Sequence, residues 1–394
     1  MKTLAMVTSS RSDFSLYVPL LRALRAHPSL QPEVIATGMH LAPAFGLTVR
    51  QIEEAGFTVQ ERVESLIPEG TPEAVAGSIG RGVVGFSKLF ARRRPDVLIV
   101  LGDRYDMFPA ALAALPFRIP VAHIAGGELT EGAIDDALRH SLTKLSHVHF
   151  VATPSYAARV LQLGEEPWRV AVVGALGVDH VRQTPRWPRE VTATRFDLDL
   201  ARPVALVTYH PVTLEYERTA EHVEHLLQAL AAAQVPCVFT APNADTSWTV
   251  IRAAIERFCA ARPRARLVLN AGAEGYLNLM NVASLMVGNS SSGLVEAPSF
   301  ELPVVNIGAR QAGRVRGINV VDCGVRAEEI GAAMARACDP AFRASLRGMA
   351  NPYGDGHAAE RIAARLATLE ASPEWLRKTF TTPANSARAE LVPA

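Results

Sequence analysis

Cysteine is scarce in this chain. Its 394 residues hold four, at positions far apart: Cys237, Cys259, Cys323 and Cys338. They show no CxxC spacing and mostly stand inside apolar runs, which argues against a disulfide framework or a zinc site. No apolar run reaches the roughly 18 residues that a membrane-spanning helix needs, and the first residues resemble a strand and loop more than a signal peptide. We therefore expect a soluble, cytoplasmic protein with no membrane partner.

A block of positive charge is also missing. The chain has 40 Lys and Arg residues against 39 Asp and Glu residues, a formal net charge of +1, and its basic residues are scattered. This balance argues against a nucleic acid or an acidic membrane surface as a partner. Any anion that the protein binds must be held by local charges.

The chain does have enough apolar residues for sizeable cores, at 49% of the total, and it is longer than one core usually serves. Short apolar strands alternate with helical patterns over residues 1–180 and again over 203–365. Residues 181–202 are rich in proline and charge, which is typical of a linker. This pattern predicts an α/β protein with two Rossmann-like domains facing a cleft. Residues 366–394 are expected to form a tail whose helix packs back on the first domain.

Polar residues gather where the predicted strands end. The first domain has "SSRSDF" at 9–14, "TGMH" at 37–40, "LGDRYD" at 101–106 and "HIAGGE" at 123–128; the second has "TYHPVT" at 208–213, "APNADT" at 241–246, "GNSSSG" at 288–293 and "GARQAGR" at 308–314. In open parallel sheets ligands bind at the carboxyl ends of the strands. These loops are therefore the predicted site.

The stretch "GNSSSGLVEAPSF" reads as an anion cradle. Ser290 and Ser291 stand between a strand and a helix, where backbone N–H groups and hydroxyls face outward. Arg310 and Arg314, one strand later, would complete a diphosphate clamp. Glu296 would accept from a ribose hydroxyl. An ordinary serine-rich helix cap is the alternative, and the lysine of a Walker loop is missing.

The stretch "DDALRH" opens a helix directly behind a Gly-Gly turn. One interpretation is purely structural, with Asp135 paired to Arg139 and Asp136 paired to His140, and with the acids favoured by the helix dipole. The other interpretation is catalytic, because this helix begins at the carboxyl end of a strand.

Five motifs together resemble one family. "GDR" at 102–104, "HIAGGE" followed by "DDALRHSLTKLSH" at 135–147, "PNAD" at 242–245, "GNSSSGLVEAPSF" and "VVNIGARQAGR" at 304–314 are similar to the hydrolysing UDP-N-acetylglucosamine 2-epimerases of sialic-acid and legionaminic-acid biosynthesis. The resemblance covers roughly residues 1–365. It implies a glycosyltransferase-B fold and a reaction that eliminates the nucleotide diphosphate and then adds water to release a free 2-epimerised sugar.

The resemblance also implies the site residues. Asp103, Asp135 and Arg139 match the catalytic group, and His210 matches a catalytic or diphosphate-contacting histidine. The positions that match substrate contacts are Arg11, His40, Arg104, Asn243, Ser290, Ser291, Glu296 and Arg310. The substrate would be a nucleotide sugar, most simply a UDP-linked one, handled without a metal or another cofactor by a homodimer or homotetramer.

One residue departs from the pattern. Ala125 stands where many relatives have a glutamate, and alanine cannot transfer a proton. Glu128 is the nearest carboxylate, with either a catalytic role or a structural bond to the glycine turn. The alternatives are a glycosyltransferase of the same fold, a non-hydrolysing UDP-GlcNAc 2-epimerase, and a non-catalytic nucleotide-sugar sensor. The exact sugar and base stay open.

Overall fold

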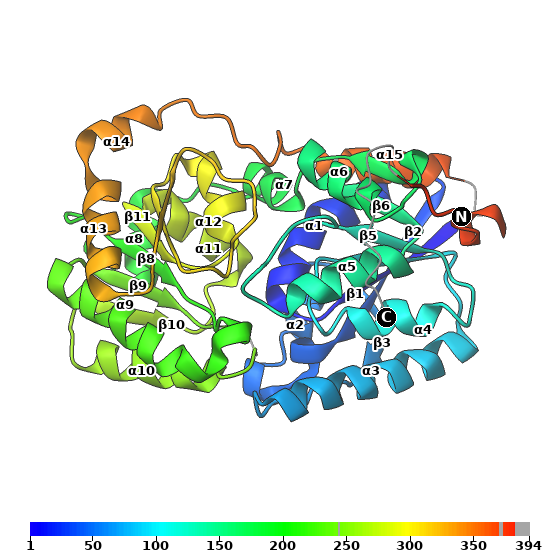
Figure 1. Ribbon diagram of the computed structural model, residues 1–394, viewed down its shortest axis with the longest axis horizontal. Helices are drawn as coiled ribbons and strands as arrows, with labels where there is room; N and C mark the ends of the chain where they lie inside the picture. Colours follow the sequence, from blue (N-terminus) through cyan, green and yellow to red (C-terminus); the bar gives the residue numbers. More distant parts are fainter. Residues whose placement is uncertain (243–244, 370–372, 383–394) are drawn as a thin grey trace, which may run out of the picture.

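The computed structural model describes residues 1–242, 245–369 and 373–382. It contains two fully parallel sheets, each covered by helices and lying side by side in Figure 1. Among the helices of these residues, none is both long and apolar enough to cross a membrane. The predicted fold class, α/β with two Rossmann-like domains, is confirmed.

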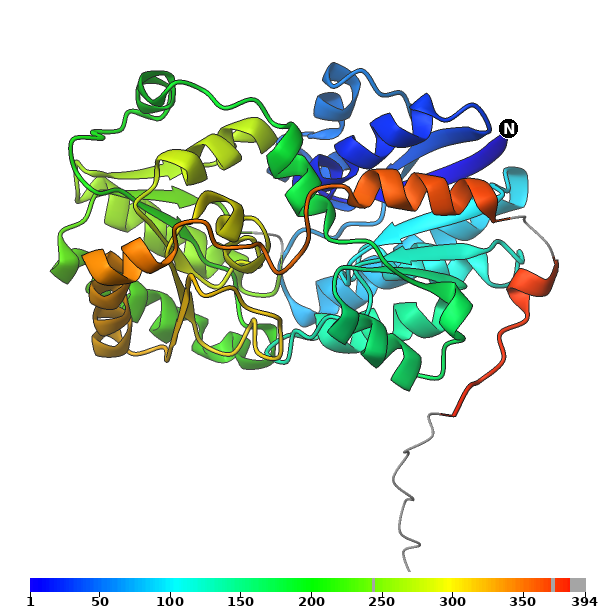
Figure 2. The ribbon, with the colours of Figure 1, turned by 90° about the horizontal axis from the view of Figure 1, so that it is seen from above.

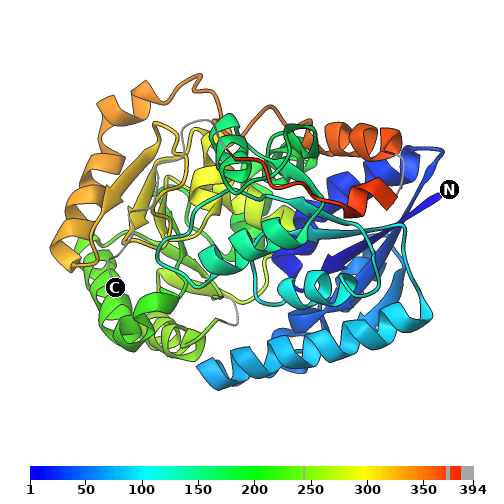
Figure 3. The ribbon, with the colours of Figure 1, turned by 45° about the vertical axis from the view of Figure 1, so that its right-hand side comes forward.

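The first sheet has seven strands in the order β3-β2-β1-β4-β5-β6-β7. Their bounds are β1 (Lys2–Thr8), β2 (Leu30–Thr37), β3 (Val59–Val63), β4 (Val97–Leu101), β5 (Val121–Ile124), β6 (Val148–Val151) and β7 (Val170–Val172). The helices that connect them are α1 (Arg11–Ala26), α2 (Val49–Glu54), α3 (Pro72–Arg92), α4 (Phe108–Ala114), α5 (Asp135–Leu145) and α6 (Pro154–Gln162), and α7 (Leu176–Gln183) follows the last strand. Figure 3 shows the long α3 along the outer edge of this domain.

The second sheet has six strands in the order β10-β9-β8-β11-β12-β13. They are β8 (Ala205–Thr208), β9 (Cys237–Thr240), β10 (Ala265–Val268), β11 (Leu285–Gly288), β12 (Val304–Ile307) and β13 (Val320–Cys323). The helices that follow α7 in the chain are α8 (Arg189–Phe196), α9 (Thr219–Ala233), α10 (Trp248–Ala260), α11 (Gly272–Val282), α12 (Ser292–Val295), α13 (Ala327–Cys338), α14 (Pro340–Ser345) and α15 (Ala358–Thr368).

Strand order reverses once in each sheet, at β1 and β4 in the first and at β8 and β11 in the second. At such a point the two neighbouring crossovers leave in opposite directions and open a crevice at the carboxyl ends. The central strands β4 and β11 are apolar and buried along their whole length, so the polar side chains of these segments come only after the strands end. The topology therefore directs the loops after β1, β4, β8 and β11 toward the two crevices.

The expected linker, residues 181–202, contains the short helix α8. This helix packs on α11 of the second domain, and Phe196 at its end is buried and stacks on Trp187 at an interplanar angle of 18°. Trp187 and Phe196 of this proline-rich segment thus pack on an apolar surface of the second domain. The hydrophobic periodicity of the sequence does not predict this packing.

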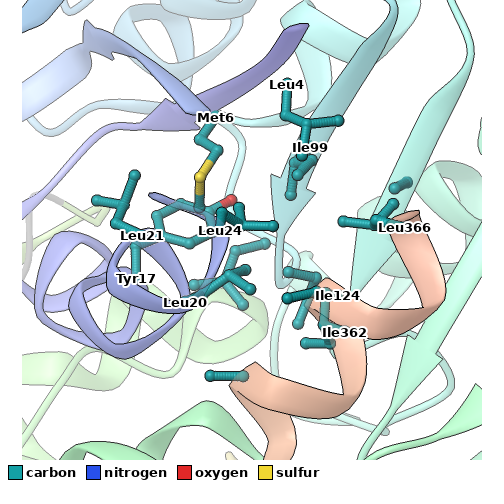
Figure 4. Close-up of a cluster of buried hydrophobic side chains, with 14 of the residues drawn as sticks. Leu4, Met6, Tyr17, Leu20, Leu21, Leu24, Ile99, Ile124, Ile362 and Leu366 are labelled. Atoms are coloured by element: carbon teal, nitrogen blue, oxygen red, sulfur yellow. The ribbon is translucent and has the colours of Figure 1, made fainter. Parts of the chain in front are cut away.

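The helix that returns to the first domain is α15, which comes earlier than the expected tail. Ile362 and Leu366 are fully buried in the same cluster as Leu20 and Ile124, and Figure 4 shows the α15 side chains beside them. Figure 2 shows the chain leaving the second domain and laying α15 along the first. We therefore propose a division in which the first domain comprises residues 1–180 together with α15, and the second domain ends before α15.

Candidate active site

A cavity of about 340 Å³ lies between the two sheets. A volume of this size suits a small organic ligand. Twelve of the predicted site residues line it: Arg11, Asp103, Arg104, Glu128, Asp135, Arg139, His210, Ser290, Ser291, Glu296, Arg310 and Arg314. The structure thus brings together side chains separated by up to three hundred residues of chain, because both switch points face the same space.

Arg139 is the centre of the first domain's charges. Its side chain is 1% exposed, forms a short ion pair with Asp103, and places Nη1 3.3 Å from a carboxylate oxygen of Glu128. Nη1 also donates to the carbonyl of Ala125 at 2.7 Å. Arg139 therefore faces Asp103 and Glu128 instead of Asp135, its expected helical neighbour. The other expected pair does form, with His140 Nε2 3.5 Å from Asp136.

The two carboxylates Asp103 and Asp135 have opposite protonation behaviour. Burial raises the pKa of Asp103, but Arg139 and the other arginines around it outweigh burial and hold its pKa below the ordinary value. Burial, together with the negative charges of Asp103 and Asp245, raises the pKa of Asp135 to about 7. Near neutral pH the first group is ionised while the second can still carry a proton. Pairs whose environments separate their pKa values in this way suit acid and base roles.

Glu128 joins the two domains. It lies 3.1 Å from Nη1 of Arg314, and Arg314 also donates through Nε to the carbonyl of Leu129 at 2.9 Å. Residue 132 must be glycine here, because a Cβ at Gly132 would lie 2.9 Å from the backbone of Arg310. The loop after β5 therefore packs directly on the loop after β12. Arg314, expected on the diphosphate, is instead committed to this junction.

In the second domain, the side chain of Asn289 positions His210. Asn289 accepts from the backbone N–H of His210 at 2.7 Å and donates to its carbonyl at 2.8 Å. Arg310 Nη1 donates to the Asn289 carbonyl at 3.2 Å. Burial, followed by the positive charge of Arg310, lowers the pKa of His210 to about 3, so the imidazole is neutral at pH 7.

The serine loop and Glu296 form the far wall of the cavity. Ser290 and Ser292 hydroxyls lie 2.9 Å apart, and Tyr276 Oη lies 2.6 Å from Ser292. The helix after the serines, α12, is only four residues long, so its dipole contributes less to an anion site than a full helix would. Burial raises the pKa of Glu296 to about 7. On this wall, the serine hydroxyls and Arg310 are the groups that could donate hydrogen bonds to an anion.

Comparison with known proteins decides the family. The model of the UDP-N-acetylglucosamine 2-epimerase family matches residues 22–367, most of the chain. The chain belongs to this family. It is 36% identical to the GDP/UDP-N,N'-diacetylbacillosamine 2-epimerase (hydrolyzing) of Campylobacter jejuni over 82% of this chain and 84% of that protein. It is 34% identical to the UDP-N,N'-diacetylbacillosamine 2-epimerase (hydrolyzing) of Legionella pneumophila over 94% and 97%.

The fold is also shared with solved structures. The UDP-GlcNAc 2-epimerase of Neisseria meningitidis, solved bound to UDP-GlcNAc, superposes with a TM-score of 0.80 at 19% identity, covering 94% of this chain and all of that one. The predicted family resemblance and the glycosyltransferase-B fold of two facing domains are confirmed.

Two predicted residues of this 2-epimerase family member remain: His40 is described but does not line the cavity, and Asn243 is not described. His40 is fully buried between Thr8 and Thr48, with its ring nitrogens 3.0 and 2.8 Å from their hydroxyls, and it is not among the described residues that line the cavity. Its role in the sugar site stays a prediction, and it braces the end of β1. Asn243 lies outside the described residues.

Sequence reasoning missed Asp245 and Asp106 as partners of Arg104. The guanidinium lies 3.1 Å from Asp245 of the second domain and 3.2 Å from Asp106 of the first. Asp245 is the last residue of the "PNAD" motif at a strand end, so its position carried a signal. The pairing of Asp245 with Arg104 carried no such signal, because it joins two domains and no local sequence pattern gives their relative orientation.

Proposed function

We propose that this protein is a hydrolysing 2-epimerase of a nucleotide-linked 2-acetamido sugar. The observation that carries the proposal is the pair of buried carboxylates with opposite protonation behaviour, Asp103 and Asp135, opposite the serine loop, Arg310 and Glu296 across one cavity. The names of the Campylobacter and Legionella relatives support a UDP- or GDP-linked 2,4-diacetamido-trideoxy sugar as the substrate, with UDP-GlcNAc as the simpler candidate.

The first chemical step is an elimination. The ionised carboxylate of Asp103 takes the C2 proton, the C2–H electrons form a C1=C2 double bond, and the C1–O bond breaks. Its electron pair leaves on the diphosphate, where neutral His210 and Arg310 donate to the developing charge. The products of this step are a nucleoside diphosphate and a 2-acetamidoglycal.

The second step is a hydration. Asp135 gives its proton to C2 on the opposite face. The oxygen of a water molecule then bonds to C1, and the proton that this water loses passes to the Asp135 carboxylate. The sum is one water consumed, one nucleoside diphosphate and one free 2-epimerised sugar released, with Asp103 returned to its ionised form on proton loss to solvent. Arg139 holds Asp103 ionised, and Glu128 holds Arg139 and Arg314 in place. Asp135 thereby takes the proton-donor role that Ala125 cannot fill.

We further propose that the free sugar is a precursor of the sialic- or legionaminic-acid type, and that the enzyme acts in the cytoplasm as a homodimer or homotetramer.

The direct test incubates purified protein with UDP-GlcNAc and with the UDP- and GDP-linked diacetamido sugars, each without an acceptor. We expect release of the nucleoside diphosphate together with a free sugar inverted at C2. An epimerised sugar still attached to its nucleotide would indicate the non-hydrolysing reaction. Intact donors in every case would contradict the proposal and favour a glycosyltransferase or a sensor.

Arg310 supplies the second domain's charged contact to the diphosphate. Replacing it by alanine is expected to weaken UDP binding by about 1.5 to 3 kcal/mol, the range of a charge-assisted hydrogen bond. Isothermal titration calorimetry measures this loss, with Arg316→Ala as the control, since Arg316 pairs with Asp322 at 2.8 Å and does not line the cavity among the described residues. Unchanged UDP affinity in the Arg310 variant would remove Arg310 from the site.

The pH dependence of turnover reports Asp135. Its carboxyl must be protonated to act as a donor, and its pKa is raised to about 7, so kcat should be constant below about pH 6 and fall about tenfold per unit well above pH 7. Asp103, with its pKa below the ordinary value, stays ionised over this range. The profile is measured at saturating substrate alongside the thermal midpoint at each pH. A flat kcat from pH 6 to 9 would show that Asp135 is not the proton donor.

A further inference from the structure

Four charged side chains form one buried cluster around the proposed base. Asp103, Glu128 and Arg139 come from the first domain, and Arg314 comes from the loop after β12 of the second. None of the four side chains is more than 15% exposed. The first domain therefore contributes two carboxylates and one guanidinium, and the second domain contributes the guanidinium that balances them.

Arg314 is fixed to the loop after β5 by three contacts. Its Nη1 lies 3.1 Å from the carboxylate of Glu128, its Nε donates to the carbonyl of Leu129 at 2.9 Å, and its Nη2 lies 3.3 Å from the hydroxyl of Thr130. The preceding residue, Gly313, has a φ of +77°, and a Cβ there would lie 2.5 Å from the Leu129 side chain. Glycine thus allows the two loops to approach closely enough for all three contacts.

Glu128 is shared by the two guanidiniums, because its carboxylate lies 3.1 Å from Arg314 and 3.3 Å from Arg139. Arg139 also pairs with Asp103. Without Arg314, one arginine would have to compensate two buried carboxylates, and such a cluster favours protonation of one of them. Arg139 and then Arg314 are the largest of the charges that hold the pKa of Asp103 below its ordinary value.

The other titratable groups that act on Asp103 do not replace Arg314. They are Arg104, Arg310, Asp135, His123 and His140. Arg104 is already paired with two carboxylates, and Arg310 faces the diphosphate in the proposed function. Burial lowers the pKa of both histidines, so they add little positive charge at pH 7. The balancing charge therefore has to come from Arg314.

Resting on the proposed function, in which Asp103 is the base, we propose that Arg314 is a positioning residue that takes up the charge of Glu128 and leaves Arg139 to Asp103. The base is then held ionised only while the loop after β12 lies against the loop after β5. Arg310 stands four residues before Arg314 on the same loop. Removal of the C2 proton is thereby tied to the segment that binds the diphosphate.

The test measures the pKa of Asp103 directly. In protein labelled with ¹³C at the aspartate carboxyls, the resonance of Asp103 is assigned by its absence from Asp103→Asn and is followed against pH. Arg314→Gln removes the charge but keeps a hydrogen-bond donor, and it should raise the pKa of Asp103 by about 1 to 2. Arg314→Lys keeps the charge and should stay close to the wild type. Arg169→Gln is the matched control, because Arg169 is also 1% exposed and pairs with Glu166 at 2.6 Å, but it does not line the cavity in the described structure.

A double variant tests the charge balance itself. Arg314→Gln combined with Glu128→Gln removes one charge of each sign and leaves Arg139 to Asp103 alone, so the pKa of Asp103 should return toward the wild-type value. If Arg314→Gln does not fold, the double variant should restore folding for the same reason. An unchanged pKa in Arg314→Gln, an equally raised pKa in the double variant, or a double variant that also fails to fold would each overturn the proposal.

Turnover and UDP binding separate this proposal from the epimerase reaction. The pH at which kcat of Arg314→Gln falls to half on the acid side should lie about 1 to 2 pH units above that of the wild type, and UDP affinity should change little. A roughly tenfold loss of UDP affinity with an unchanged pKa of Asp103 would place Arg314 on the diphosphate instead. The carboxyl titration needs no turnover, so the two proposals fail separately. A raised pKa without sugar release from any donor removes only the epimerase reaction, and sugar release with an unchanged pKa removes only the role of Arg314.

Discussion

Replacing Asp135 by asparagine is expected to lower kcat by roughly 10²- to 10⁴-fold, the size of a general acid–base contribution. The change is isosteric and removes only the transferable proton. UDP affinity should be nearly unchanged, because the nucleotide contacts that we propose come mainly from the loops after β8, β11 and β12. The measurement is kcat for sugar release beside the calorimetric affinity for UDP.

Stability provides the control for this variant. A carboxyl whose folded pKa is raised to about 7 binds its proton more tightly in the folded than in the unfolded state. Its contribution to stability is therefore present below about pH 4 and is lost as the pH rises toward 7. Asparagine does not ionise, so Asp135→Asn should be at least as stable as the wild type at pH 8. Near-normal turnover would return Asp135 to a helix-dipole role and leave Glu128 as the remaining proton donor.

Replacing Arg139 by methionine is expected to lower the free energy of unfolding by about 3 to 5 kcal/mol, because it leaves a buried charge without its partner. Asp103 and Glu128 would both lose their contact with the guanidinium. Turnover should also fall, since Arg139 is the largest of the charges that keep Asp103 ionised. Urea unfolding at pH 7 measures the first effect.

The pH dependence of the free energy of unfolding provides a second test of the Arg139→Met prediction. In the wild type the lowered pKa of Asp103 stabilises the fold above the unfolded value near 4 and ceases to do so as the pH falls through the folded value. The difference between wild type and Arg139→Met should therefore shrink from pH 7 to pH 4, where unpaired carboxylates can take up protons. Arg139→Lys keeps the charge and should recover part of the loss. A difference of less than 1 kcal/mol at pH 7 would contradict the buried pairing.

The sequence predicted which side chains come together where one rule governed their position. Polar residues placed after apolar strands must meet when the strands are parallel, and Asp103, His210 and Ser290 do meet in the cavity. The loops after β1, β4, β8 and β11 could each be predicted from their own stretch of sequence. The same rule predicted the crevice, since strand order reverses at these strands.

The rest depended on contacts between distant segments. Arg314 pairs with Glu128, and Arg104 pairs with Asp245, because the two domains lie close enough to form ion pairs with each other. Local periodicity carries no information about that approach. His40 shows the converse case: its strand-end position suggested the site, but hydroxyls at Thr8 and Thr48 satisfy its ring in the interior.

The return of α15 bears on how the protein folds during synthesis. Ile362 and Leu366 complete the cluster that also holds Leu4 and Leu20, and Lys2 Nζ donates to the carbonyl of Leu366 at 2.7 Å. The domain that the ribosome makes first therefore keeps an apolar face uncovered until nearly the whole chain has emerged, whereas the second domain's core is already complete in sequence. Closing a contact across 364 residues is slow relative to local pairing. The first domain can therefore bury this face only after α15 has been made, so a nascent chain stalled before residue 358 would leave the face open to solvent.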